Sequence, residues 1–306
     1  MKLRVAIIQL NSILRQPTQN ITKIHNLISS KPNFKNVDLI VLPEMSITGY
    51  YFKSSQDITP YLESTNSFGP SLNFARDLSR KYNCFTVIGY PESDNSKIYN
   101  SCATFNRTGK LIHNYRKTFL YETDEVWGCE ENPNKGFPAT KLKFKDDEED
   151  VIVNFGICMD LNPYKFEAPF HAFEFGSSCL NQKARLIICP MNWLTNESPS
   201  LHKEIQETKR CEMAKELEAK MKLDNSPNVT NLNYWILRFY PYLQDELTWL
   251  KDDDKVHVLI ANRVGVEDDI VYGGSSCTLK FNDGENYLSS VLGQCKEDIL
   301  IHDIDV

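Results

Sequence analysis

Three reactive side chains each follow an apolar run that is typical of a buried strand. Glu44 comes after Val37–Leu42 and Pro43, Lys117 follows a short hairpin, and Cys158 closes the run Val151–Ile157. Side chains at strand ends of an α/β sheet commonly converge on a ligand cleft. A cysteine thiolate there can attack a carbonyl carbon, a carboxylate can carry its proton, and a lysine can stabilise the negative charge that develops. The trio therefore indicates covalent hydrolysis of a carbonyl substrate.

Each of these residues also has an ordinary structural interpretation when it is taken alone. A free cysteine is often buried in a core, a carboxylate at a strand end often caps backbone donors, and a lysine is usually solvated. Gly156 permits close backbone approach beside Cys158, as a nucleophile requires. The case for catalysis therefore rests on all three together.

Alternating strands and helices are expected to position these residues. Buried strands are predicted by β-branched apolar runs, and helices by apolar residues at helical spacing. The predicted strands are Leu3–Leu10, Val37–Leu42, Phe85–Gly89, Tyr99–Asn106, Leu111–Tyr115, Val151–Ile157, Ala184–Cys189, Val256–Asn262 and Ser275–Phe281. The predicted helices are Ile21–Ile28, Ser71–Lys81 and His202–Lys222, and Asp224–Asn233 is expected to be a polar loop. This alternation indicates an α/β fold.

Two further features concern the organisation of the chain. The windows Leu39–Glu44 and Leu186–Met191 resemble each other, which is consistent with two related halves of a layered fold. The acidic run Lys145–Asp150 is expected to be an exposed hairpin tip, because apolar runs flank it closely.

Length and composition favour one soluble domain over residues 1–306. The chain is 41% hydrophobic and contains 16 Phe, 14 Tyr and 4 Trp, which is enough for a sizeable core. Its net charge of −7 argues against a nucleic-acid or anionic-membrane surface, since both need clustered cations. No apolar run approaches the ~20 residues of a spanning helix.

The cysteines and histidines do not form a recognisable metal or disulfide pattern. Nine cysteines is an odd number, no CxxC pair occurs, and the six histidines never have HExxH spacing. We therefore expect reduced thiols, no metal and a cytoplasmic protein. Glycosylation-type matches such as those at Asn20, Asn106 and Asn228 are interpreted as chance, because no signal-like segment precedes them.

The motifs around the trio resemble those of the nitrilase-like carbon–nitrogen hydrolase superfamily. They are an apolar triplet followed by Pro-Glu at Glu44, Tyr-Arg-Lys-Thr at Lys117 and Gly-Ile-Cys-Met-Asp at Cys158, in that order. The resemblance implies an αββα sandwich, an acyl-thioester intermediate and no cofactor. It also implies that Glu44 is the general base, Lys117 the oxyanion-stabilising cation and Cys158 the nucleophile.

A longer set of segments resembles one branch, the eukaryotic amidases that remove the side-chain amide from N-terminal Asn or Gln of proteins. The segments are Leu42–Tyr50, Asn114–Tyr121, Cys129–Pro133, Gly156–Phe166, Cys189–Trp193 and Asn233–Phe239. The polar stretch near Asn225 is shorter than the insertion of fungal members, which puts the role of that region in doubt. The branch implies protein N termini as partners and a product that degradation machinery of the N-degron pathway can recognise.

A substrate with a free α-ammonium needs acceptors within hydrogen-bond reach. The acidic candidates are Glu130, Glu131 and Asp160, although Asp160 could equally hold its loop through backbone hydrogen bonds. The superfamily has a further Glu between the Lys and Cys motifs, and Glu130 or Glu131 is its expected counterpart. Tyr50, Trp127 and Trp193 are candidates for the pocket wall, although aromatic residues beside strands are more often core residues.

Two other functions remain open at this point. One is another small-amide hydrolase of the superfamily, such as an ω-amidase or a carbamoylase, which the trio does not exclude. The other is a non-catalytic module that binds protein N termini, which loss of one of the three residues would have favoured. The preference between Asn and Gln, the tolerated second residue and the oligomeric state are not decided by the sequence.

Overall fold

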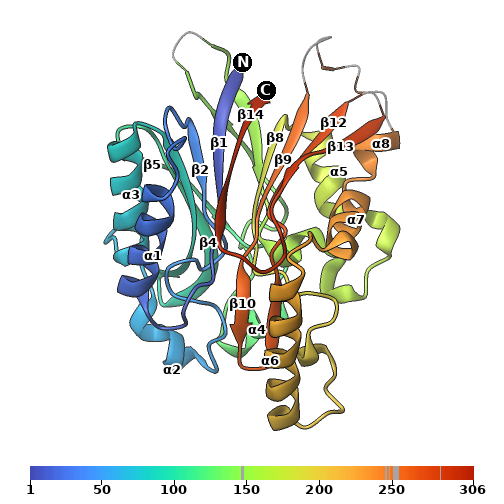
Figure 1. Ribbon diagram of the computed structural model, residues 1–306. Helices are drawn as coiled ribbons and strands as arrows, with labels where there is room; N and C mark the ends of the chain where they lie inside the picture. Colours follow the sequence, from blue (N-terminus) through green and yellow to red (C-terminus); the bar gives the residue numbers. More distant parts are fainter. Residues whose placement is uncertain (146–147, 245–246, 248, 251–254, 283) are drawn as a thin grey trace.

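Two six-stranded sheets pack face to face, and helices cover the outer side of each (Figure 1). The computed structural model describes residues 1–145, 148–244, 247, 249–250, 255–282 and 284–306. The resulting layers confirm the predicted αββα sandwich.

The first sheet has the order β14-β1-β2-β3-β4-β5. Its strands are β1 (Lys2–Gln9), β2 (Leu39–Val41), β3 (Phe85–Asp94), β4 (Lys97–Phe105), β5 (Leu111–Arg116) and β14 (Asp298–Asp305). Strands β1, β2 and β3 run parallel, and β14 pairs antiparallel with β1 along its whole length. β14 is an addition to the predicted strands.

The second sheet has the order β13-β12-β9-β8-β7-β6. Its strands are β6 (Ala139–Leu142), β7 (Val151–Phe155), β8 (Leu186–Pro190), β9 (Val256–Ala261), β12 (Cys277–Asn282) and β13 (Glu285–Val291). Strand β8 lies between its parallel neighbours β7 and β9, as β2 lies between β1 and β3. The two similar sequence windows thus occupy equivalent places in the two sheets.

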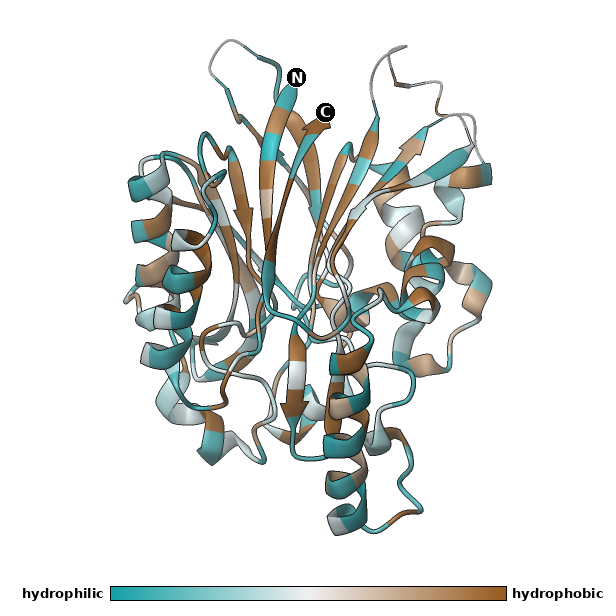
Figure 2. Ribbon diagram, in the orientation of Figure 1, coloured by the Kyte–Doolittle hydropathy of each residue, from teal (hydrophilic) through white to brown (hydrophobic). Residues whose placement is uncertain are grey.

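Side chains of the central strands alternate between two apolar layers. Along β1, Leu3, Val5 and Ile7 join the core between the sheets, whereas Ala6 and Ile8 face the helices that cover the first sheet. This alternation follows from the two-residue period of a strand, and it requires apolar residues on both faces. Figure 2 shows the result as strands that are mostly hydrophobic between helices with hydrophilic outer surfaces.

The helices lie outside the sheets and below their lower edge as drawn in Figure 1. They are α1 (Pro17–Ser29), α2 (Ser55–Ile58), α3 (Pro70–Tyr82), α4 (Glu122–Val126), α5 (Glu174–Asn181), α6 (Glu207–Leu223), α7 (Val229–Arg238) and α8 (Pro241–Gln244). A separate hairpin consists of β10 (Val264–Glu267) and β11 (Ile270–Gly273). No described helix has both the length and the apolar character that crossing a bilayer would need.

Two predicted segments differ from the structure. The predicted loop Asp224–Asn233 contains the start of α7, because the Asn228 side chain accepts a hydrogen bond from Asn231 N at 3.0 Å and caps the helix. Helix α6 begins at Glu207, later than predicted. The predicted hairpin tip Lys145–Asp150 does connect the antiparallel strands β6 and β7, but its residues 146 and 147 lie outside the described residues.

Candidate active site

Glu44 lies in a tightly packed turn that follows β2. The next residue, Met45, has a left-handed φ of 48°, and Gly89 of β3 passes directly beneath the turn. A Cβ atom on Gly89 would lie 2.6 Å from Glu44 Cα, so only glycine permits this approach. The Glu44 side chain is fully buried: Oε1 accepts from Lys117 Nζ at 2.8 Å and from Asn100 Nδ2 at 2.7 Å. Within the described part of the chain, Oε2 has no partner and remains able to accept a proton.

Lys117 follows β5, and two carboxylates hold its ammonium group. Its Nζ lies 2.8 Å from Glu44 Oε1 and 2.7 Å from Asp124 Oδ2, with all three side chains buried. Backbone bonds from Lys117 N to Asn100 O, at 2.8 Å, and from Asn132 N to Lys117 O, at 3.0 Å, fix the main chain. The ammonium therefore has a fixed position at the end of the first sheet.

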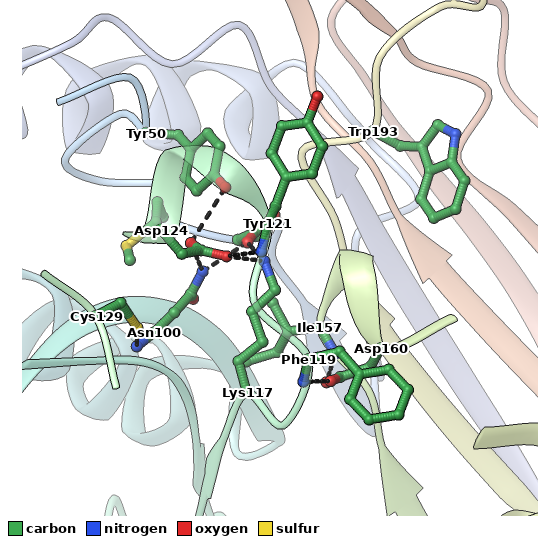
Figure 3. A network of polar contacts seen from close by, with 12 residues as sticks. Tyr50, Asn100, Lys117, Phe119, Tyr121, Asp124, Cys129, Ile157, Asp160 and Trp193 are labelled. Carbon is green, nitrogen blue, oxygen red and sulfur yellow. Dashed lines mark hydrogen bonds and ion pairs between the residues drawn. The ribbon is translucent and has the colours of Figure 1, made fainter. Parts of the chain in front are cut away.

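Asp124, from α4, is the centre of the polar network in Figure 3. Besides Lys117, it accepts hydrogen bonds from Tyr50 Oη at 3.1 Å, Asn100 Nδ2 at 3.0 Å and Tyr121 N at 2.9 Å. Asn100, on β4, thus bridges the two carboxylates that contact Lys117. This network makes Lys117 part of a rigid cluster and leaves it no freedom to reach solvent.

Cys158 lies three residues beyond the end of β7 and begins a short 3-10 helix, Cys158–Leu161. Its φ of 44° is left-handed, a conformation that costs a non-glycine residue free energy and is common at functional turns. Its side chain is half-buried, whereas the described cysteines of the two sheets are buried. The strained turn thus presents the sulfur at the boundary between the core and a cavity.

Asp160 connects the Cys158 turn to the segment that follows Lys117. Its Oδ1 accepts from the backbone N–H groups of Thr118, at 3.0 Å, and Phe119, at 2.7 Å. Its Oδ2 accepts from Ile157 N and from Tyr115 Oη, both at 2.8 Å. Burial raises the pKa of Asp160 to about 6, although these donors act in the opposite direction. Asp160 therefore positions Lys117 relative to Cys158.

The ionisation of the three central groups follows from their burial and their mutual charges. Burial raises the pKa of Glu44, and the Lys117 ammonium only partly opposes this. Burial acts to lower the pKa of Lys117, but the carboxylates of Asp124 and Glu44 outweigh it, so that the pKa is raised and the ammonium persists. Burial, together with the Glu44 carboxylate, raises the pKa of the Cys158 thiol. The resting site therefore holds a thiol, a strongly held ammonium and a carboxylate with increased basicity.

A cavity of about 350 Å³ opens above this cluster. Its lining consists of Tyr50, Tyr121, Cys158, Met159, Asn162, Phe166, Asn192, Trp193, Leu194, Thr195, Asn196, Leu201, Thr230, Asn231 and Tyr234. Among these described lining residues there is no Asp, Glu, Lys or Arg. A ligand in this cavity is thus surrounded by aromatic rings, amides and hydroxyls. The charged cluster lies behind this lining and contacts it through Tyr50.

Comparison with known proteins places this site in a family. The model of the carbon-nitrogen hydrolase family matches residues 4–162, a segment that contains the Glu44, Lys117 and Cys158 motifs. The chain is a carbon–nitrogen hydrolase. It is 35% identical to the protein N-terminal amidase of Saccharomyces cerevisiae over 84% of this chain and 68% of that one. It is 32% identical to the protein N-terminal amidase of Schizosaccharomyces pombe over 95% and 96% of the two chains.

Solved structures extend the comparison of this carbon–nitrogen hydrolase to the fold. An N-terminal amidase crystallised with an Asn-Glu-Ala peptide superposes with a TM-score of 0.86 and 29% identity, covering 99% of this chain and 97% of that one. An N-terminal amidase crystallised with a Gln-Gly peptide gives a TM-score of 0.85 and 28% identity, covering 99% of this chain and 97% of that one. The predicted family and its N-terminal amidase branch are thus confirmed.

The predicted pocket residues have different places in this carbon–nitrogen hydrolase. Tyr50 and Trp193 line the cavity, and their contact with a substrate stays a prediction. Trp127 is fully buried in an apolar cluster with Tyr50 and Phe52, so it supports the wall from behind instead of forming it.

The predicted acidic residues Glu130, Glu131 and Asp160 are not among the described lining residues of the cavity. Glu130 is exposed and pairs with Lys97 at 2.7 Å, and Glu131 accepts from the Tyr164 hydroxyl at 2.8 Å near the surface. Both follow the turn of α4 and face outward, whereas Asp124 supplies the carboxylate that contacts Lys117. Asp160 already accepts four hydrogen bonds and is not among the described lining residues.

Sequence reasoning missed Asp124 and Asn100. Asp124 lies among other acidic residues, Glu122 and Glu125, and nothing in their local order shows which one turns inward. The short helix α4 decides this, because it buries Asp124 and leaves Glu122 and Glu125 exposed. Across the described residues, no cluster of three or more His, Cys, Asp and Glu is arranged to hold a metal ion.

Proposed function

We propose that this carbon–nitrogen hydrolase is an N-terminal amidase that converts N-terminal Asn, and Gln, of proteins and peptides to Asp and Glu with release of ammonia. The observation that carries the proposal is the buried Glu44–Lys117–Asp124 cluster, which contacts the wall of a cavity that Cys158 lines. The N-terminal amidase relatives, which match most of the chain, support the choice of substrate. The neighbouring crystal structures with Asn-Glu, Asn-Glu-Ala, Gln-Gly and Gln-Val peptides support it too.

In the first half of the reaction, Cys158 attacks the carbon of the side-chain amide. Glu44 Oε2 takes the thiol proton as the sulfur–carbon bond forms, and Lys117 stabilises the negative charge that develops on the amide oxygen. Glu44 then returns the proton to the nitrogen, the carbon–nitrogen bond breaks, and ammonia leaves. A thioester on Cys158 remains. One of the neighbouring structures is of a cysteine-to-serine variant of an N-terminal amidase, which agrees with a nucleophilic cysteine.

In the second half, water hydrolyses the thioester. Glu44 accepts a proton from the attacking water and passes it to the sulfur as the sulfur–carbon bond breaks, which gives the carboxylic acid, the free thiol and the ionised Glu44. The raised pKa of Glu44 suits both halves, because a stronger base removes each proton more readily. Asp124 contributes by keeping Lys117 charged and fixed.

The cavity lining favours peptides over free amino acids and ω-amide acids. A free α-carboxylate in a cavity of this size would need an Arg or Lys partner, and the described lining residues include neither. A peptide carbonyl replaces that carboxylate without a charge. The ω-amidase alternative thus lacks the cation that its substrates require.

The test compares three substrates. The purified protein is incubated with a peptide that begins with Asn, with its N-acetylated twin and with free asparagine, and ammonia release is followed beside a Cys158→Ala variant. We expect release from the free-amine peptide only, and none from the variant. Equal release from the acetylated twin would replace the proposal with a general amidase, and release chiefly from free asparagine would favour a small-amide hydrolase.

A further inference from the structure

The side-chain amide of Asn192, in the cavity wall, has no hydrogen-bond partner in the described structure. Asn192 follows β8 and is 1% exposed, and within the described structure neither its Oδ1 nor its Nδ2 has a hydrogen-bond partner. Other asparagines around the cavity are satisfied: Asn162 accepts from Tyr234 Oη at 2.7 Å, and Asn231 Nδ2 donates to Leu194 O at 3.0 Å. A buried amide without partners is costly, and such groups in native proteins usually have a specific reason.

Asn192 also lies beside the nucleophile. It lines the same cavity as Cys158, and its backbone N–H is a donor that favours the thiolate of Cys158. A ligand whose reactive carbon is placed at the sulfur therefore brings its nearest polar groups to the Asn192 amide.

The proposed substrate has two polar groups at the matching distance. In an N-terminal Asn, three covalent bonds separate the attacked carbon from the α-nitrogen, so the ammonium lies within about 4 Å of that carbon. The oxygen of the first peptide bond branches from the same Cα. The ammonium offers only donors and the carbonyl only an acceptor, whereas a carboxamide offers one acceptor oxygen and two N–H donors.

We propose that Asn192 recognises the free N terminus: its Oδ1 accepts a hydrogen bond from the α-ammonium, and its Nδ2 donates one to the carbonyl oxygen of the first peptide bond. The inference rests on the proposed function and names the residue that makes a free α-amine a requirement. It replaces the acidic residues that the sequence suggested for this task, none of which lines the described cavity.

A neutral amide also suits the charged cluster behind the cavity lining. Two carboxylates, Glu44 and Asp124, already accompany one ammonium there. A third carboxylate beside Cys158 would oppose thiolate formation, since like charges disfavour a second anion. The substrate ammonium brings a positive charge toward this cluster, and the Asn192 oxygen can receive it without adding a negative one.

The test combines a substrate change with a residue change. Ammonia release is measured as kcat/KM for an Asn-peptide and for its desamino twin, in which hydrogen replaces the α-amine and the scissile amide is unchanged. The wild-type protein should prefer the amine by about ten- to a hundredfold, as a hydrogen bond to a charged group can supply. In Asn192→Leu this preference should fall to within about threefold.

Two further variants keep the result decisive. Asn192→Asp retains an acceptor and should keep the preference for the amine while lowering kcat, because it adds a negative charge next to the thiol. Asn134→Leu changes an exposed asparagine outside the cavity and should keep both rates. Thermal unfolding of each variant confirms that it is folded under the assay conditions.

The outcomes separate the inference from the proposed function. If Asn192→Leu slows both substrates equally and leaves the preference intact, Asn192 only supports the Cys158 turn and the inference is wrong. A loss of the preference in Asn192→Asp would also overturn it. If the wild-type protein releases no ammonia from the Asn-peptide, the proposed function itself fails, whatever the variants do.

Discussion

Replacement of Asp124 by Asn tests whether the buried cluster sets the basicity of Glu44. Both carboxylates contact the same Lys117 nitrogen, at 2.7 Å and 2.8 Å, so their nearest oxygens lie within about 5 Å of each other. Two like charges at that distance repel by about 3 kcal/mol at an effective dielectric constant of about 20. The Asp124 charge thus adds to burial in raising the pKa of Glu44.

Asp124→Asn should move the acid limb of the pH–activity profile to lower pH. Glu44 acts as a base only when it is ionised, so activity is lost as the pH falls through its raised pKa. Asp124→Asn removes a negative neighbour and lowers that pKa. The acid limb of the kcat/KM profile should move to lower pH by about two pH units, because about 1.4 kcal/mol corresponds to one unit. The maximal rate should fall at least about tenfold, because Glu44 becomes a weaker base and Lys117 loses one of its two holders.

The assay is ammonia release from an Asn-peptide between about pH 4 and pH 6.5, below the range in which the substrate α-amine titrates. Urea unfolding measured beside it ensures that the variant is folded at each pH, since Asp124→Asn also removes an acceptor from buried donors. Glu130→Gln is the matched control: this carboxylate is exposed, pairs with Lys97, and should change neither limb nor rate. An unchanged acid limb in Asp124→Asn, or one that moves to higher pH, would refute the electrostatic argument.

Three further predictions follow from the same geometry. Cys158→Ser should abolish ammonia release while Cys211→Ser, in half-exposed position on α6, keeps it, and mass spectrometry should detect the acyl-enzyme on Cys158 alone. Asp160→Asn should lower the free energy of unfolding by about 2–4 kcal/mol in urea, because an NH₂ group would then face two hydrogen-bond donors; an unchanged midpoint would contradict this. Gly89→Ala should reduce kcat at least about tenfold, because the added Cβ displaces the Glu44 backbone, and retention of full kcat would show that the turn can relax.

The sequence could predict the central strands and the order of the three reactive residues. β1 and β8 are apolar on both faces, which produces the continuous β-branched runs of strands buried between layers. β14 was missed although its Ile299 and Leu300 are buried, because its polar residues interrupt the apolar run. Its identity as a strand depends on pairing with β1, almost 300 positions earlier, and no local pattern contains that information.

In the candidate site too, local sequence patterns identify some residues, and only tertiary packing identifies the others. Glu44, Lys117 and Cys158 stand out because each follows a recognisable strand or hairpin. Choosing Asp124 over Glu130 or Glu131 required the rotation of α4, which tertiary packing determines. The roles of Asp160 and Asn192 depend on counting hydrogen-bond partners, and a sequence does not supply that count.

The pairing of β1 with β14 has a consequence for biosynthesis. At about 5–20 residues per second, a ribosome needs tens of seconds to pass from the first strand to its partner, and throughout that time one edge of β1 has no neighbour. Such an unpaired apolar edge is a template for aggregation, so chaperone protection during synthesis would be of most use to this strand. Docking of β14 is then a late, long-range folding step, and we expect the recovery of activity on refolding to follow its rate.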